Sequence, residues 1–498
     1  MKKLIIVDLN KDIPNHFEEN CYYININVGK IKLNNGKKLL FKNLKKYEIR
    51  ARESLGRELK KKLNTINDVF YQQLEIFNLR NDKEFSISKV INFLKINFLI
   101  KDKHFDEIKI ITDSASSIKI IKSFNKNIRI ISYVSKQLRF NLMFIKILKF
   151  YFKAFFLVSF IKIFSSSKFK IKNEIGMTIY PIFFTKESDN FYKNKDITYL
   201  NFLLTDETHL GHSLFQIIKI YLRLKNKNIL FTEKYIDYLD ILKGFVNSIL
   251  RLIYLKRKNN TLFIEKINFS DFYKNYLYSS FVNRCKLNIY NYAIPKILKK
   301  NNIKKFHMYL FEYNFGFFLI NIIKKLNIYI KGYQHGIFST KLFWYDIILK
   351  YNHNKFIPNE IVSSNHYSFT QYKILLKKRT KISLEKQKKP SFLINFKFKK
   401  KYGIKKILIL PGTHDIKDFY TFVKDRVRSN QKNKYFFKLH PKNKFIFKPE
   451  KNLHIIDKFD TITFNKVIVS STSTLVYDFN KIKIPFEVFR PDYKLESY

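Results

Sequence analysis

Cysteine, glycine and proline are all scarce in this chain. Two cysteines, Cys21 and Cys285, occur in 498 residues and lie far apart. They offer neither the spacing of a zinc site nor a disulfide framework, which favours a reducing cytoplasm. Glycine (11) and proline (10) are few, whereas Lys, Asn, Ile, Phe and Tyr are over-used.

Long uncharged apolar runs are also missing. The longest in the helix-like segment 137–164, residues 154–161, is too short to cross a bilayer. The N-terminal run Leu4–Val7 is too short for the core of a secretion signal, so it predicts a first β-strand.

Acidic residues are outnumbered. The chain has 95 Lys and Arg against 40 Asp and Glu, a formal net charge of +55. Such an excess indicates an acidic partner: a nucleic acid, an anionic lipid or a phosphorylated substrate. Biased codon usage is the alternative, because the over-used residues have A/T-rich codons and the charge is spread along the whole chain. Attraction to an anionic membrane surface is expected in either case.

Several familiar motifs are absent from the sequence. It contains no Asp-x-Asp pair at a strand end, no P-loop or GxGxxG, no GxSxG and no zinc spacing. No bound metal is therefore expected. Sequence patterns of RNA- and DNA-binding modules are missing as well, so nucleic acid is not an expected partner.

Apolar runs alternate with helix-like segments along most of the chain, which predicts an α/β fold with parallel sheets. The strand–helix–strand spacing of 306–333 is that of a βαβ unit. We predict an N-terminal α/β domain at 1–374, a basic linker at 375–401 and a C-terminal domain at 402–498. The strands expected in the last domain are 405–410, 435–439, 453–456, 466–469 and 484–488.

Residues 137–164 differ from their surroundings, because Phe, Leu and Ile dominate and lysines are interspersed. At 100° per residue, five basic residues from Lys136 to Lys153 share one stripe. This predicts an amphipathic helical insertion that lies in a membrane surface. The alternative is a core helix whose lysines form its solvated edge.

Two strand ends near the C-terminus carry groups that suit a phosphate. One strand ends in Lys438 and is followed by His440, and the next strand of this kind ends at Ser471, Thr472 and Ser473. Ligands of open α/β sheets bind beyond the carboxyl ends of strands. Gly412 and Thr413 follow a third strand, where the glycine permits a tight turn near a ligand.

Two further strand ends offer groups for proton transfer. His335, in Gln334-His335-Gly336, can accept the proton of an attacking hydroxyl, or can be a hydrogen-bonded turn residue. Glu312 can orient His335 or bind acceptor hydroxyls, or it can cap the following helix. The acid- and imidazole-rich segment 205–212 suits a solvated loop or acceptor site better than a metal site.

The Gln-His-Gly, Lys-Leu-His-Pro and Ser-Ser-Thr-Ser elements at 334–336, 438–441 and 470–473 resemble a group of bacterial surface-carbohydrate enzymes. The group includes CMP-sugar-dependent sialyl-, polysialyl- and Kdo-transferases and CDP-glycerol glycerophosphotransferases. The resemblance spans about 305–480 and implies a GT-B fold, in which two Rossmann-like domains face a central cleft.

The resemblance also implies roles for individual residues. His440, with Ser471, Thr472 and Ser473, would bind the nucleotide phosphate, and His335 would be the base. The acidic base motif of the sialyltransferases has no clear match, and 414–415 is a loose substitute. The chain ends soon after the strand expected at 484–488, so the last domain is expected to be truncated relative to GT-B enzymes.

These observations predict an inverting, metal-independent glycosyltransferase of lipopolysaccharide or capsule synthesis. Its donor would be a CMP- or other nucleotide-activated sugar, its acceptor a glycan or glycolipid, and no cofactor is expected. We expect it in the cytoplasm, peripheral on the inner face of the cytoplasmic membrane. A CDP-glycerol-type glycerophosphotransferase and a non-enzymatic basic protein that binds membranes or nucleic acid are the alternatives.

Overall fold

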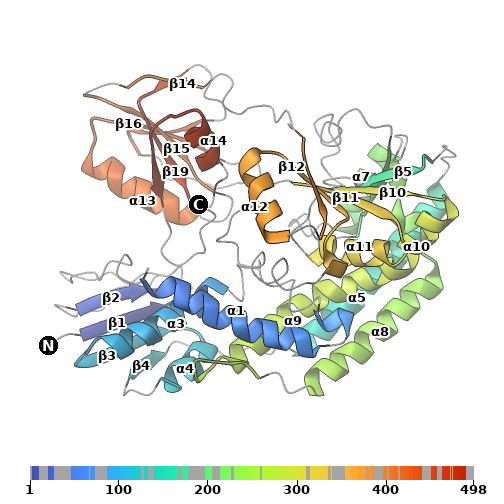
Figure 1. Ribbon diagram of the computed structural model, residues 1–498, viewed down its shortest axis with the longest axis horizontal. Coiled ribbons are helices and arrows are strands. Elements are labelled where there is room, and N and C mark those ends of the chain that lie inside the picture. The colour runs from blue at the N-terminus through green and yellow to red at the C-terminus, as the bar shows by residue number, and fades with distance from the viewer. Residues whose placement is uncertain are drawn as a thin grey trace.

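Helices and strands alternate along the chain in the computed structural model (Figure 1). The structure describes residues 3–9, 21–26, 46–66, 68–72, 87–124, 128–132, 140–165, 171–177, 197–204, 213–225, 229–257, 261–309, 314–334, 338, 354–376, 379–385, 396–400, 403–412, 416–439, 450–456, 462–471, 473 and 475–489.

The first sheet is parallel throughout, in the spatial order β2 (Cys21–Asn25), β1 (Lys3–Asp8), β3 (Glu107–Thr112) and β4 (Arg129–Ser132). Its central strands are apolar runs, and every residue of β1 after Lys3 is buried. Runs of this kind suit a parallel sheet, which is covered on both faces. The helices of this region are α1 (Glu48–Thr65), α3 (Ile87–Asp102) and α4 (Ala115–Lys122).

A larger parallel sheet lies at the centre of the chain. Its seven strands, in spatial order, are β13 (Lys381–Leu384), β12 (Glu360–Ser363), β11 (Tyr329–Tyr333), β10 (Lys305–Tyr309), β5 (Glu174–Met177), β6 (Thr198–Asn201) and β7 (Ile229–Phe231). Phe306, Ile330 and Ile361 bury one face of the sheet in the main apolar core. Helices α10 (Tyr290–Lys300), α11 (Asn314–Lys324) and α12 (His366–Leu376) belong to this region.

Long helices run from beside the first sheet to below the central sheet in the view of Figure 1. They are α5 (Phe140–Phe164), α8 (Tyr238–Arg257) and α9 (Ser270–Lys286), with the shorter α7 (Leu214–Leu224) and the hairpin β8 (Phe263–Ile264) and β9 (Ile267–Asn268) nearby. One continuous apolar cluster includes Leu4 of the first sheet and Ile361 of the central sheet. The two sheets therefore share a core.

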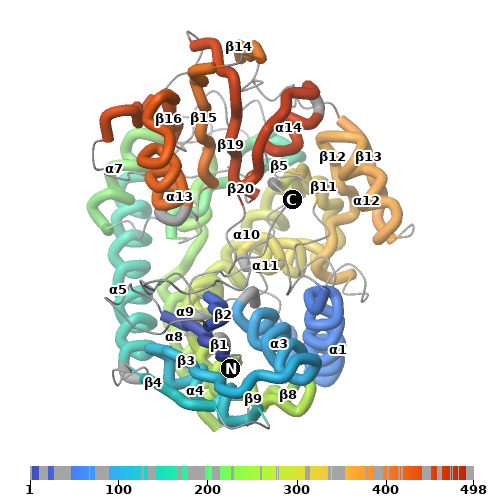
Figure 2. The backbone as a smooth tube through the Cα atoms, turned by 90° about the vertical axis from the view of Figure 1, so that its left-hand side faces the viewer, coloured from blue at the N-terminus to red at the C-terminus, as the bar shows by residue number. Residues whose placement is uncertain are grey.

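The C-terminal sheet is parallel and has cores of its own. Its strands are β17 (Leu453–Ile456), β16 (Lys434–Lys438), β15 (Lys406–Leu410), β19 (Lys466–Ser470) and β20 (Phe486–Phe489), and a short pair joins β14 (Lys397–Phe398) to β18 (Thr463–Phe464). Figure 2 shows α13 (Ile416–Ser429) and α14 (Leu475–Lys481) on opposite sides of β15 and β19. Each helix packs into a separate apolar cluster.

The α/β class with parallel sheets, predicted from the sequence, is confirmed. The range predicted as one N-terminal domain, 1–374, contains the first sheet and six of the seven strands of the central sheet. The segment predicted as a linker, 375–401, includes β13 and β14. Neither strand was recognised, because each is short and lies within a lysine-rich segment.

The helix predicted within 137–164 is present as α5, but its faces differ from those expected. One side is buried in the main core through residues such as Ile147, Ala154 and Leu157. The opposite side is not simply a solvated lysine edge, because Phe152 is 64% and Ile163 75% exposed. The core-helix alternative therefore describes one side of α5 and leaves an exposed apolar side to explain.

Candidate functional site at the carboxyl ends of the strands

Four of the predicted phosphate-binding residues lie at one edge of the C-terminal sheet. β16 and β19 flank β15 in parallel register, and Leu410 is the partner of Val469. Gly412, Lys438, Ser471 and Ser473 all lie at or just beyond the carboxyl ends of these strands. Since neighbouring strands are about 4.8 Å apart, the corner at Lys438 lies roughly 10 Å from the corner at Ser471.

Backbone hydrogen bonds fix the corner after β19. The Ser471 amide donates to the Phe489 carbonyl at 2.8 Å, and the Ser473 amide donates to the Ser470 carbonyl at 3.0 Å. The Ser473 hydroxyl accepts the amide of Leu475 at 3.3 Å, so it helps to begin α14 and keeps its own proton for donation. Ser471 is buried, whereas Lys438 is half-buried and brings a positive charge to the edge.

The other predicted site residues lie outside the described residues. They are Glu312, His335, Thr413, His440 and Thr472. The strands that lead to them are described, and Tyr309 and Tyr333, which end β10 and β11, are partners in register. The chain therefore leaves the central sheet at one edge, shortly before Glu312 and before His335.

Gln334, which was not among the site residues predicted from sequence, is buried at this edge and makes several hydrogen bonds. Its amide nitrogen donates to the Ser368 hydroxyl at 2.8 Å. Its amide oxygen accepts the Ser363 hydroxyl at 2.9 Å and the Ser364 backbone amide at 3.1 Å. The network ties the end of β11 to the end of β12 and the start of α12. In the sequence, the polar residues directly after these two apolar strands are the pattern from which this network could have been predicted.

The central and C-terminal sheets meet through helices that follow their strands. Tyr367, in the first turn of α12, follows β12, and Tyr477, in the first turn of α14, follows β19. Their rings lie with centroids 6.1 Å apart. Both helices begin just after the carboxyl ends of strands, so this contact joins two residues that each follow such an end.

The face of the central sheet that points away from the main core carries a buried polar chain. His307 forms a hydrogen bond with each ring nitrogen. Nδ1 lies 2.9 Å from the Tyr333 hydroxyl, and Nε2 lies 2.7 Å from a carboxylate oxygen of Glu174. Burial raises the pKa of Tyr333. Burial alone would raise the pKa of Glu174, but the hydrogen bonds and electrostatic attraction of His307 and Lys305 together outweigh it and hold that pKa below its ordinary value. None of these residues was singled out from sequence.

A second part of the same face is an ion-pair cluster on its outer strands. The Lys331 ammonium lies 2.8 Å from Glu385 and 3.4 Å from Glu360. Burial works against ionisation of Glu360, but the Ser383 hydroxyl and Lys331 outweigh it and lower the pKa of the carboxyl. The charges on this face therefore compensate one another within the sheet.

Glu233 is a fully buried carboxyl in the turn after β7. One oxygen accepts the Tyr290 hydroxyl at 2.6 Å and the amides of Leu203 and Leu204 at 2.8 and 3.1 Å. Burial nevertheless raises the pKa of Glu233 to about 7. The carboxyl holds the chain just before 205–212, the acid- and imidazole-rich segment, which lies outside the described residues.

The carboxyl edge of the first sheet also holds a buried charge. Asp8, the last residue of β1, forms an ion pair with Lys89 at 2.7 Å. It also accepts the hydroxyl of Thr112, the last residue of β3, at 2.9 Å. The paired Asp8 stabilises the sheet edge, because a buried carboxylate needs a partner.

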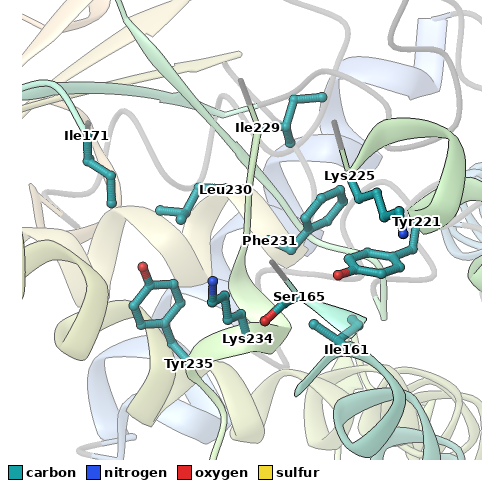
Figure 3. A pocket seen from close by; sticks show the side chains of 10 residues that line it. All are labelled: Ile161, Ser165, Ile171, Tyr221, Lys225, Ile229, Leu230, Phe231, Lys234 and Tyr235. Atoms are coloured by element: carbon teal, nitrogen blue, oxygen red, sulfur yellow. The ribbon is translucent and has the colours of Figure 1, made fainter. Parts of the chain in front are cut away.

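A small pocket lies between α5, α7 and β7, beside the turn after β7 that holds Glu233 (Figure 3). Its lining combines apolar side chains with the polar groups of Ser165, Lys225 and Lys234 and with two tyrosines, Tyr221 and Tyr235. None of the site residues predicted from sequence lines it. Within the part of the chain that the structure describes, no three His, Cys, Asp or Glu side chains gather closely enough to hold a metal ion.

Comparison with known protein families and with curated proteins finds no match to this chain. The fold and the edges described above define an α/β protein with several parallel sheets, whose polar groups gather at the carboxyl ends of strands.

Proposed function

We propose that the protein is an inverting glycosyltransferase that transfers a sugar from a CMP- or other nucleotide-activated donor to a bacterial surface glycan or glycolipid. The observation that carries the proposal is the Tyr367–Tyr477 contact. It supports a GT-B-like arrangement in which the carboxyl edges of the central and C-terminal sheets flank one site. Ligand sites of open α/β sheets lie at such edges.

In the proposed reaction, the acceptor hydroxyl attacks the anomeric carbon and the bond from that carbon to the donor phosphate breaks. His335, or a carboxylate such as Glu312, takes the hydroxyl proton. The leaving nucleotide keeps the electron pair of the broken bond. Lys438, His440 and the Ser471–Ser473 corner stabilise its phosphate by charge and hydrogen bonds.

Gly412 and Thr413 belong to the same proposed phosphate site, because they follow β15 between the other two corners. Gln334 supports the proposal from the opposite side. Its buried hydrogen bonds fix the backbone from which His335 continues. A base held by a rigid neighbour keeps its geometry between the bound donor and the acceptor.

Nucleotide binding tests the proposal. The purified chain is titrated with CMP, CDP, UDP and GDP, and the expected result is saturable binding of a cytidine nucleotide. Lys438→Ala should weaken it about tenfold or more, since one hydrogen bond to a charged group is lost. Lys434→Ala is the matched control, because Lys434 lies on the same face of β16 at its other end and is exposed. It should bind like the wild type.

Other outcomes of the titration would contradict the proposal. The proposal would be wrong if both substitutions weakened nucleotide binding equally, or if the wild type bound no nucleotide. Salt-sensitive polynucleotide binding that ignores Lys438→Ala would instead favour a basic nucleic-acid-binding protein. A separate activity assay distinguishes the two reactions. If the protein turned over CDP-glycerol but not CMP-sugars, the acceptor would attack phosphorus, as in the glycerophosphotransferases.

A further inference from the structure

Helices α5 and α8 pack side by side and leave an apolar surface on their outer side. Tyr151 and Phe245 have ring centroids 5.6 Å apart, and the rings of Phe155 and Tyr238 are 5.3 Å apart. The Ser159 hydroxyl lies 3.1 Å from that of Tyr238. These contacts pair the middle of α5 with the middle of α8 and the end of α5 with the start of α8, so the helices are antiparallel.

The outer surface of α5 is apolar over most of its length. Leu142, Phe144 and Phe164 are also exposed on α5, but six of its exposed apolar side chains form a stripe that falls within roughly 100° at 3.6 residues per turn. Each of them is at least 44% exposed; they are Ile145, Leu148, Phe152, Phe155, Phe156 and Ile163.

The outer surface of α8 repeats the pattern. Its stripe spans roughly 80° by the same helical geometry. The side chains are at least 42% exposed and are Leu239, Leu242, Val246, Leu250 and Ile253. On both helices the stripe lies next to the residues that contact the other helix. The two stripes therefore form one surface, the α5–α8 face, which is defined by these eleven side chains.

Basic residues border the α5–α8 face, and acidic ones are almost absent. Lys146 and Lys149 are exposed on α5, and Lys243, Lys256 and Arg257 are exposed on α8. α5 contains no Asp or Glu. The single acidic residue of α8, Asp240, is buried and paired with Lys296 at 2.6 Å.

We propose that the α5–α8 face docks on an anionic lipid bilayer, with both helices lying flat in the interface. An apolar face bordered by lysines and arginines is the pattern of interfacial helices. Negative lipid headgroups complement the basic border. A second copy of the same face would instead place like charges opposite each other. Among the described residues, no helix is long and apolar enough to cross a bilayer, so docking takes place without a span.

Vesicle binding of the full chain tests this proposal. The probes are vesicles of phosphatidylcholine alone and of phosphatidylcholine mixed with phosphatidylglycerol. The wild type should bind the mixed vesicles more tightly, and salt should weaken that binding. Phe152→Glu with Leu242→Glu should weaken binding about 100-fold, because the loss of each buried apolar side chain lowers the affinity about tenfold.

A matched control carries the same added charge elsewhere. Ile374 on α12 is 59% exposed and Ile404 is 60% exposed, and neither belongs to the α5–α8 face. Ile374→Glu with Ile404→Glu should bind vesicles like the wild type. A third variant, Lys146→Gln with Lys149→Gln and Lys243→Gln, keeps the apolar face and should lose the preference for anionic vesicles.

Three outcomes would overturn the docking proposal. They are no vesicle binding by the wild type, equal loss in the control variant, and a soluble dimer that Phe152→Glu with Leu242→Glu dissociates. The last result would assign the α5–α8 face to a second copy of the chain. Nucleotide titration is independent of these measurements, so a failure here leaves the proposed function untouched, and the reverse also holds.

Discussion

Single buried polar residues hold several strand ends of this protein in place. Gln334 satisfies two serines at the end of β12 and the start of α12. Glu233 collects two backbone amides and a tyrosine hydroxyl after β7. A buried polar group without partners costs free energy, so each residue rigidifies the loop that it binds. The same rigidity makes them sensitive positions for stability.

Stability should depend on pH through Glu233. Its pKa is raised from 4.5 to about 7 by burial. Between these values the folded state keeps the proton that the unfolded state has lost, so the free energy of unfolding falls as the pH rises through this window. Glu233→Gln keeps a neutral side chain at every pH. We expect this variant to gain up to about 3 kcal/mol relative to the wild type between pH 4.5 and 7.

Urea unfolding of both proteins across this window measures the effect. The substitution itself also changes the free energy of unfolding by an amount that does not depend on pH. This amount cancels when the difference between the two proteins at one end of the window is subtracted from the difference at the other end. A difference that stays constant with pH would show that Glu233 titrates alike in the folded and the unfolded chain.

At the scale of elements, the close approach of α5 and α8 depends on one glycine. A Cβ atom at Gly244 would lie 3.0 Å from a ring carbon of Tyr151 and 3.2 Å from Ile289. Tyr151 cannot easily move, because its hydroxyl donates to the Cys285 carbonyl at 2.9 Å and lies 3.0 Å from the Ser248 hydroxyl. Gly244 therefore sets the distance between the helices that form the α5–α8 face.

Gly244→Val should lower the free energy of unfolding by about 2 kcal/mol, because the added carbons overpack the helix contact. The neighbouring substitution Lys243→Val is the control. It is exposed, so it should cost about 0.5 kcal/mol through helix propensity alone. Denaturant unfolding compares the two. Equal losses would mean that the helices separate without strain.

At the scale of the whole molecule, the contact between Tyr367 and Tyr477 joins two sheets with separate apolar cores. Parallel sheets expose their ligand-binding edges at the carboxyl ends of strands. The relative position of the central and C-terminal sheets therefore decides whether their polar corners flank one site.

Cross-linking tests this position. Cys21 and Cys285 are both buried, so they resist thiol reagents. Burial also raises the pKa of Cys285 to about 12. Tyr367→Cys with Tyr477→Cys should be joined efficiently within one chain by a short bifunctional maleimide, as mass spectrometry can detect. Tyr367→Cys with Lys434→Cys, at the amino end of β16, should be joined poorly. Similar yields would mean that the two sheets are not held in this position.

The amino-acid sequence by itself determined the strands and their class. Buried apolar runs such as Lys406–Leu410 and Lys466–Ser470 are long enough to be recognised one at a time, and the helices between them imply parallel pairing. It also placed Lys438 and Ser471 at strand ends. Short strands such as Lys381–Leu384 were not predicted, because four residues within a lysine-rich segment are too few to show a periodic pattern.

Only the tertiary structure determined the features that depend on contacts between residues far apart in the sequence. It brought the corners of β15, β16 and β19 to one edge, because strand order depends on pairing between distant segments. It buried Glu233 and Gln334, whose partners lie roughly 30 residues away. It also selected which apolar side of α5 enters the core. A helix that is apolar almost all round does not specify that choice, and packing against α8 and α9 leaves the other side exposed.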